Sequence, residues 1–146
     1  MKQFFTNPKF KLFLSALGLA DASYLTYEHF AKASVFCISA DSCDKVLSSA
    51  YATLGSLPLS VIGVLYYGLI LALSVYFMIS HEEKIAVLLF YVTSAGLAMS
   101  AIFVGLQIFV IHAICYWCML SAITTTLLFI TSLMSVREFE AEPQKI

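Results

Sequence analysis

Four long apolar stretches constrain what this chain can fold into. They cover residues 10–27, 57–79, 85–111 and 114–136. Crossing a hydrocarbon layer of about 30 Å takes about 20 apolar residues in a helix. Because backbone groups cannot remain unpaired in lipid, and these stretches are too long for barrel strands, we expect four transmembrane helices. The predicted fold is therefore an all-α membrane protein, a bundle of four transmembrane helices.

The composition agrees with a membrane environment. Of the 146 residues, 61% are apolar and 12% are charged, and the mean hydropathy is +0.92. A soluble domain usually carries about 25% charged residues. The net charge is −1 and no block of like charges is present, so nothing indicates a nucleic-acid partner. The length predicts one domain over residues 1–146.

The basic residues predict the orientation of the helices. Most of them lie at the two ends of the chain and between the second and third stretches, which by the positive-inside tendency are expected to be cytoplasmic. The loop of residues 29–56 and the turn near His112 then face the extracytoplasmic side, where disulfides persist. The basic residues expected at the cytoplasmic side are Lys2, Lys9, Lys11, Lys84, Arg137 and Lys145, whereas the loop carries only Lys32 and Lys45.

The first stretch has one alternative interpretation, as a signal peptide. Ala31-Lys32-Ala33 has the shape of a cleavage site. Asp21 interrupts the apolar segment, however, and Glu28-His29 lies where a signal peptide is usually less polar. We therefore favour a helix that stays in the protein.

The long extracytoplasmic loop is expected to contain a short amphipathic helix. Apolar residues recur at helical spacing from Val46 to Leu54, with polar residues largely elsewhere. Such a helix would lie on the membrane surface or cap the bundle. Gly55-Ser56 then breaks the chain, and Pro58 is expected in the first turn of the second helix.

Four cysteines lie at the predicted extracytoplasmic side. Cys115 and Cys118 are three residues apart at the start of the fourth helix, on one helical face, close enough to form a disulfide. A helix N-terminus favours the thiolate form of a cysteine. Cys37 and Cys43 lie in the loop, at a spacing that allows a small disulfide. Together they suggest a two-stage thiol relay.

Two other roles for these cysteines remain open. A loop pair often serves as a structural staple, in which case the chain would be a structural membrane protein with four spans. Two cysteine pairs also provide four ligands for zinc. The apolar sequence around Cys115 offers no polar residues to support such ligands, so no metal site is expected.

The order and spacing of these residues resemble the vitamin K epoxide reductase family, in its bacterial and archaeal branch. The resemblance covers essentially the whole chain. The matching pieces are Tyr24-Leu25 with His29, Cys37, Cys43-Asp44-Lys45-Val46-Leu47-Ser48-Ser49, Gly55-Ser56-Leu57-Pro58-Leu59 with Gly63, and Cys115-Tyr116-Trp117-Cys118.

The resemblance implies specific roles for the site residues. Cys37 would exchange with a thioredoxin-like partner, Cys43 would pass oxidising equivalents between Cys37 and Cys115, and Cys118 would face a quinone. Ser49 matches a serine near the quinone pocket. Leu59 and Ala122 stand where the vertebrate enzymes have asparagine and tyrosine, so epoxide reduction is not expected.

The resemblance also implies a function and a cellular location. The chain is expected to be a membrane thiol:quinone oxidoreductase that uses a ubiquinone or menaquinone type of quinone and supports disulfide formation outside the cytoplasm. Its partner would be a separate DsbA-type protein, because this sequence ends soon after the fourth helix. The location would be a prokaryotic cell membrane, with the cysteines on the extracytoplasmic side.

Several other residues of the apolar stretches have two interpretations. Asp21 is either functional, or it faces the inside of the bundle and is protonated or hydrogen-bonded to Tyr24, Ser60 or Thr93. Gln107 and His112 are candidate hydrogen-bond donors to a quinone, although interfacial solvation is favoured for His112. Candidate aromatic residues for an apolar pocket are Phe36, Tyr116 and Trp117.

Overall fold

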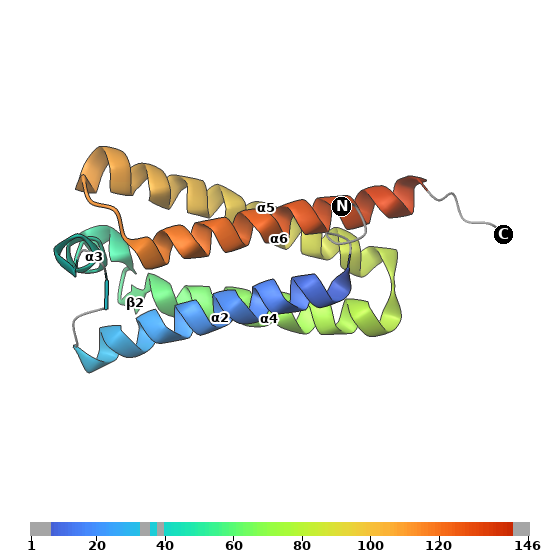
Figure 1. Cartoon of the computed structure of the whole chain (residues 1–146), viewed down its shortest axis with the longest axis horizontal. Helices are drawn as coiled ribbons and strands as arrows, with labels where there is room; N and C mark the ends of the chain where they lie inside the picture. The colour runs from blue at the N-terminus through green and yellow to red at the C-terminus, as the bar shows by residue number, and fades with distance from the viewer. Residues whose placement is uncertain (1–6, 33–35, 38–39, 142–146) are drawn as a thin grey trace.

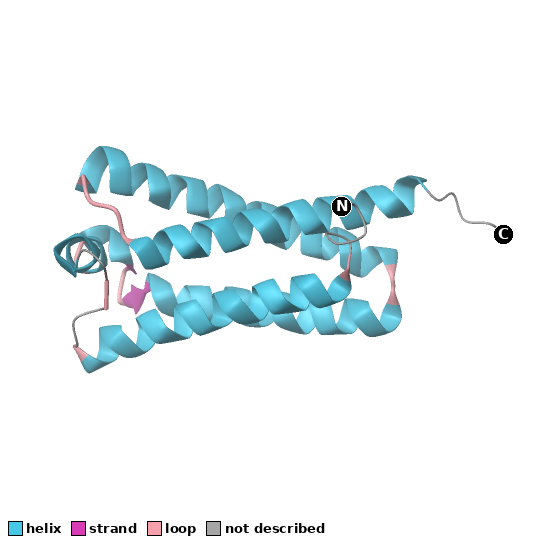
Figure 2. Cartoon of the chain, viewed as in Figure 1, coloured by secondary structure: helices cyan, strands magenta, loops and turns pink. Residues whose placement is uncertain are grey.

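The computed structural model describes residues 7–32, 36–37 and 40–141. Its body consists of four long helices that run side by side (Figures 1 and 2). The connection between α4 and α5 lies at one end of this body, and α3 (Ala40–Leu47) lies at the other (Figure 1). The long helices are α2 (Pro8–Ala31), α4 (Leu59–Ser80), α5 (Glu83–Leu106) and α6 (Tyr116–Ala141).

Local sequence explains where these helices begin and end. The Asn7 side chain caps α2 by accepting the Lys9 N–H at 3.0 Å, and Pro8 occupies the first helical position, where its missing N–H costs nothing. The C-caps Lys32 and His81 adopt left-handed backbone angles, with φ of 52° and 49°, and end α2 and α4. The predicted helices therefore exist, with boundaries shifted by a few residues.

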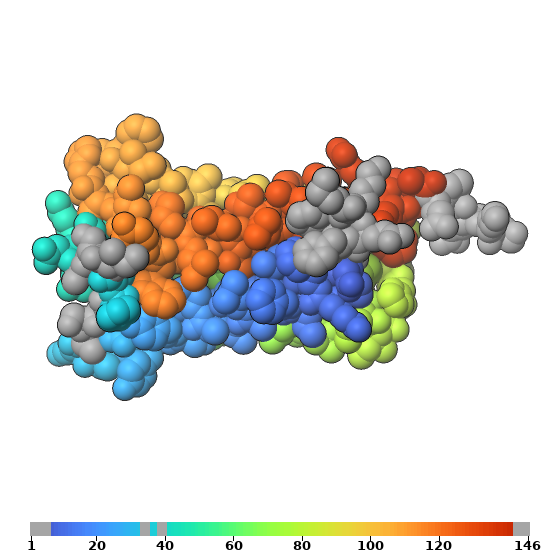
Figure 3. All heavy atoms as spheres, viewed as in Figure 1, coloured from blue at the N-terminus to red at the C-terminus, as the bar shows by residue number. Residues whose placement is uncertain are grey.

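Three of these helices are long and apolar enough to cross a membrane: α4, α5 together with its π-helical extension η2 (Gln107–Ile111), and α6. The protein is thus an all-α, multi-pass membrane protein with one very small β-hairpin. Helix α2 is more polar, because it contains Lys9, Lys11, Asp21 and Glu28. It nevertheless packs along α4 and α6 (Figure 3).

The loop between α2 and α4 differs from its prediction. Helix α3 ends at Leu47, where the Ser49 hydroxyl donates to the Val46 carbonyl at 2.7 Å and ends the run of backbone hydrogen bonds. A 3-10 turn, η1 (Ala50–Ala52), and two short strands, β1 (Thr53–Leu54) and β2 (Leu57–Pro58), follow. The expectation of a helix reaching Leu54 is therefore wrong.

Pro58 also has a different position from the one expected. It belongs to strand β2 and is the N-cap residue of α4, directly before the first residue of that helix. Gly55, with φ of 68°, makes the tight turn that pairs Thr53 with Pro58. The turn residues Gly55 and Ser56 thus form a hairpin rather than a simple break before the helix.

Helix packing depends on small residues facing aromatic rings. A Cβ atom on Gly18 of α2 would overlap the Tyr67 ring of α4, and one on Gly96 of α5 would overlap Tyr66. Gly63 faces Ala22 of α2 rather than α5, and Gly68 has no neighbour within 4 Å of such an atom. Gly96 is thus the glycine at which α4 and α5 approach each other closely.

Polar contacts join the helices at two levels. The Tyr67 hydroxyl contacts the Ser121 carbonyl oxygen at 2.9 Å, and the hydroxyls of Ser121 and Thr125 at 2.8 Å. Nearer the other end, the Lys11 ammonium group donates to the Ser135 hydroxyl and lies 4.9 Å from the centre of the Phe77 ring. These contacts tie α2 and α4 to α6.

Replacing Gly18 with Ala tests the close approach of α2 and α4. The added methyl group displaces the Tyr67 ring, so we expect a loss of about 1–3 kcal/mol in the free energy of unfolding. Thermal unfolding of purified protein in detergent measures the effect. Gly68→Ala is the matched control and should leave the melting temperature unchanged. Equal melting temperatures for both variants would contradict this packing.

Candidate functional site

All four cysteines lie in one cluster at the end of the bundle that carries α3. Cys43 and Cys115 have no exposed surface, and they pack with Val46 and Ala113. Cys37 and Cys118 are partly buried against this cluster. The fold therefore brings the loop pair into contact with the pair at the start of α6, although up to 81 residues of sequence separate them.

The two pairs differ in redox state. Cys37 and Cys43 form a disulfide, with an S–S distance of 2.07 Å and a Cα–Cα distance of 6.5 Å. Cys115 and Cys118 are free thiols. The arrangement thus places a disulfide beside a dithiol, the two components that thiol-disulfide exchange requires.

Cys115 occupies the N-cap position of α6. Its carbonyl accepts the Met119 N–H at 3.0 Å, which is the first hydrogen bond of the helix. A hydrogen bond from the Cys118 thiol, supported by the backbone N–H groups of Cys118 and Trp117, lowers the pKa of Cys115 to about 7 against the opposing effect of burial. Cys115 is therefore set up as a nucleophilic thiolate at neutral pH.

Gln107 fixes the position of Cys115 from the preceding turn. Its side-chain oxygen accepts the Cys115 N–H at 2.9 Å, and its backbone carbonyl accepts the N–H groups of His112 and, at 3.1 Å, Ala113. His112 is exposed and has a left-handed φ of 52°. The side-chain carbonyl of Gln107 thus accepts a hydrogen bond from the Cys115 backbone, and Gln107 positions this cysteine.

An aromatic clasp, formed by Tyr24, Phe36 and Trp117, holds the loop next to the dithiol. The Phe36 N–H donates to the Tyr24 hydroxyl at 3.2 Å, and the Trp117 indole N–H donates to the Phe36 carbonyl at 2.9 Å. The Tyr24 and Trp117 ring centroids are 4.8 Å apart. Because Phe36 precedes Cys37, the clasp fixes the backbone beside the disulfide.

None of the three candidate pocket aromatics, Phe36, Tyr116 and Trp117, lines the cavity between the helices. The Phe36 side chain is 84% exposed, and Tyr116 is also exposed. In Phe36 only the backbone takes part in the site, and a backbone role of this kind cannot be recognised from residue type. Trp117 is partly buried against the cysteine cluster.

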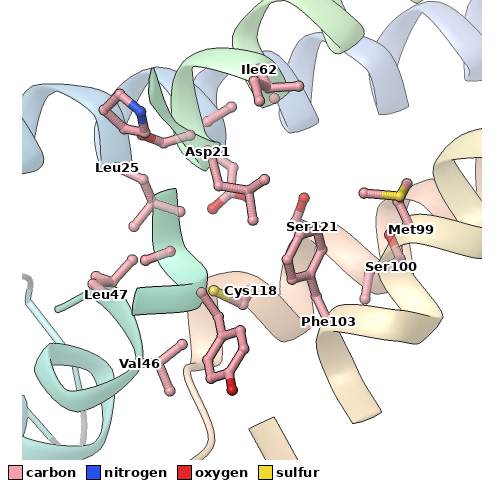
Figure 4. A pocket seen from close by; sticks show the side chains of 18 of the residues that line it. Asp21, Leu25, Val46, Leu47, Ile62, Met99, Ser100, Phe103, Cys118 and Ser121 are labelled. Carbon is pink, nitrogen blue, oxygen red and sulfur yellow. The ribbon is translucent and has the colours of Figure 1, made fainter. Parts of the chain in front are cut away.

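A cavity of about 910 Å³ begins at Cys118 and extends between the helices (Figure 4). Most of its wall is apolar, and it is formed by α2, α4, α5 and α6 with residues from the loop. Ser49, Leu59 and Ala122 all belong to the wall. Within the dithiol, Cys115 therefore packs in the cysteine cluster, and Cys118 lines the apolar cavity.

The Ser49 hydroxyl donates its proton to the Val46 carbonyl. Its oxygen retains the capacity to accept a hydrogen bond. The side chain lies at the cavity wall, and its hydroxyl proton has a partner within the loop.

Among the described residues, three side chains at the cavity wall carry buried polar atoms without a hydrogen-bond partner. They are Asp21 of α2, which is 5% exposed, with both carboxyl oxygens, Glu28 of α2 with one oxygen, and Tyr66 of α4 with its hydroxyl. Thr93 donates to carbonyls of its own helix instead of to Asp21. The expected hydrogen bonding of Asp21 inside the bundle is therefore wrong. Tyr66 was missed by sequence reasoning, because a tyrosine in an apolar stretch carries no distinguishing signal.

The described residues contain no group of three or more His, Cys, Asp or Glu side chains that could hold a metal ion. Two of the four cysteines, Cys37 and Cys43, are joined in the disulfide. A sulfur in a disulfide does not provide the thiolate that zinc binding requires.

The thiolate character of Cys115 is testable by titration. In the Cys37→Ser/Cys43→Ser variant, we expect thiolate ultraviolet absorbance to appear with a midpoint near pH 7, since the Cys118 thiol stabilises the Cys115 thiolate. Adding Cys118→Ala removes this hydrogen bond and should raise the midpoint by about one unit or more, into the ordinary thiol range above about pH 8. An unchanged midpoint would contradict the assignment.

Comparison with known proteins agrees with this geometry. A sequence model of the vitamin K epoxide reductase family matches residues 10–133. The thiol-disulfide oxidoreductase LTO1 of Arabidopsis thaliana is 34% identical over 128 residues, which cover 82% of this chain. The chain spans only 34% of the length of that relative. The resemblance noted in the sequence is thus confirmed, and the chain belongs to the vitamin K epoxide reductase family.

Proposed function

We propose that this protein is a membrane thiol:quinone oxidoreductase, which reoxidises a separate thioredoxin-like or DsbA-type protein and passes the electrons to a quinone. The observation that carries the proposal is the position of the dithiol. Cys115 packs against the loop disulfide while Cys118 lines an apolar cavity. Such a pair connects aqueous thiol chemistry with a lipid-soluble acceptor. LTO1 supports the thiol-disulfide part of the function by its name.

The proposed electron route passes through all four cysteines. A partner dithiol attacks Cys37 and reduces the Cys37–Cys43 disulfide. The Cys43 thiolate then attacks Cys115 of the oxidised Cys115–Cys118 pair, forming a Cys43–Cys115 disulfide and releasing the Cys118 thiolate. Attack of Cys37 on Cys43 restores the loop disulfide and leaves the helix dithiol. That dithiol gives two electrons to the quinone and becomes a disulfide again.

The cavity has the properties that a quinone requires. Its volume lies within the range of small-molecule sites, and its wall is apolar with few polar groups. Leu59 and Ala122 both lie on this wall, so the two polar residues of the vertebrate enzymes are replaced by apolar ones. The Tyr66 hydroxyl lies at this wall without a hydrogen-bond partner, and we assign to it a hydrogen bond to a quinone carbonyl.

The same proposal includes a membrane topology. Helix α2 would be the fourth span, because it packs along α4 and α6, and residues 1–146 would form a single domain. The ends of the chain would be cytoplasmic, and the cysteine cluster with α3 would lie at the extracytoplasmic surface of a prokaryotic membrane. The supporting observations are the charge distribution and the location of all four cysteines at one end of the bundle.

Replacing Cys118 with Ala tests the route. The Cys115 thiolate attacks Cys43 and releases Cys37, and because Cys37 is then the thiol of the route that can reopen the product, we expect a detectable Cys43–Cys115 disulfide and no quinone reduction. Peptide mass spectrometry without reductant identifies the disulfide. Spectrophotometry with a dithiol donor follows the quinone. Ser94→Ala is the control, since Ser94 bonds only within α5. Quinone turnover by the Cys118 variant would disprove the route and favour a structural role for the cysteines.

Replacing Tyr66 with Phe tests the quinone site separately from the cysteines. Loss of one hydrogen bond to the quinone should raise KM for the quinone about fivefold, the equivalent of about 1 kcal/mol. The rate of disulfide exchange between Cys43 and Cys115 should not change. An unaltered KM would exclude the Tyr66 hydroxyl from quinone binding.

A further inference from the structure

Asp21 has no structural role that its contacts explain. Its side chain is 5% exposed, both carboxyl oxygens are shielded from solvent, and neither has a hydrogen-bond partner. An unpaired carboxyl group in a membrane bundle is expensive to keep. The Tyr67 hydroxyl, which also lies at this wall, is already bonded to the hydroxyls of Ser121 and Thr125.

The position of Asp21 points to the dithiol and the cavity. Asp21 lies at the cavity wall together with Cys118 (Figure 4). Its charge acts on both Cys115 and Cys118. Other ionisable groups facing it are Tyr66 and Tyr67 of α4. The α5 residues on the cavity wall contribute none.

A second carboxyl group continues the same face of α2 towards the loop. Glu28 is seven residues further along, two helical turns or about 10 Å, and also lines the cavity. One of its oxygens, like those of Asp21, is buried without a partner. Lys32 and Asp44 line the cavity near the loop. This face therefore places a second carboxyl group between the loop side and Asp21.

The proton balance of quinone reduction requires a donor at this place. Reducing a quinone to a quinol takes two electrons and two protons. The hydrogen bond from the Cys118 thiol lowers the pKa of Cys115 and so favours its thiolate form. The pair then carries two electrons but only the Cys118 proton. One proton is missing.

We propose that Asp21 donates this second proton to the quinone and recovers it from the loop side through Glu28. In the complete step, the S–S bond between Cys115 and Cys118 forms and the Cys118 S–H bond breaks. Two electrons pass to the quinone, whose oxygens gain the Cys118 proton and the Asp21 proton. Asp21 is left as a carboxylate until it is reprotonated. This inference rests on the proposed function.

The test compares Asp21→Asn and Asp21→Glu in the full chain, reconstituted into liposomes with a dithiol donor and a short-chain ubiquinone. Asn is nearly isosteric but cannot give up a proton, so we expect kcat to fall about 100-fold above pH 7. Below pH 7 the Cys115–Cys118 pair carries both protons, so the defect should shrink on acidification. Asp21→Glu should restore most of the rate.

Two controls separate the possible outcomes. Ser74→Ala changes another buried, unpartnered polar side chain, outside the cavity, and should keep the wild-type rate. Asp21→Asn in the Cys118→Ala background should still trap the Cys43–Cys115 disulfide, which shows that the fold and the exchange step are intact.

A wild-type kcat for Asp21→Asn at every pH would overturn the inference, and so would a change confined to KM. A defect of equal size at all pH values, not restored by Glu, would also overturn it. Suppose that the Cys118→Ala variant forms the Cys43–Cys115 disulfide but the wild-type protein never reduces the quinone. The proposed function then fails, and the role of Asp21 fails with it.

Discussion

The hydrogen bond from the Cys115 N–H to the Gln107 side chain determines where α6 begins. In a membrane protein an unpaired N–H at a helix start is costly, so a buried acceptor fixes the first residue of the helix. With that start fixed, Cys118 lies one turn further along, at the wall of the cavity. The π-helical end of α5 supplies the acceptor, because it carries Gln107 into the turn. The positions of both helix cysteines therefore depend on a residue that is not a cysteine.

The loop disulfide depends on a different kind of contact. Cys37 is held through the backbone of its neighbour Phe36, which bonds to Tyr24 of α2 and to Trp117 of α6. Cys43 is held by α3, whose Val46 packs into the same cluster as Ala113. The two halves of the site thus share Trp117, which follows the nucleophilic position by two residues. A change at this tryptophan affects the loop and the helix pair together.

Sequence reasoning predicted the long helices, the two cysteine pairs and the family, because hydrophobic length and cysteine spacing are local properties. It failed where contacts between distant segments decide. Pro58 was expected in a helix, but the turn at Gly55 pairs it with Thr53 in a hairpin. The hydrogen bond from the Cys115 N–H to the Gln107 side chain could not be predicted either, because it joins two residues across the turn before α6. Tyr66 could not be distinguished from a packing residue until its position at the cavity was known.

The complete burial of Cys43 and Cys115 has a consequence for selectivity between thiol pools. In the proposed route, these two sulfurs exchange only with each other and with their own partners in the chain. Soluble thiols would enter this route at Cys37, which is only partly buried and follows Phe36, the residue whose backbone the clasp holds. The fold would in this way insulate the quinone from the general thiol pool, so that electrons arrive from partners able to dock at the loop.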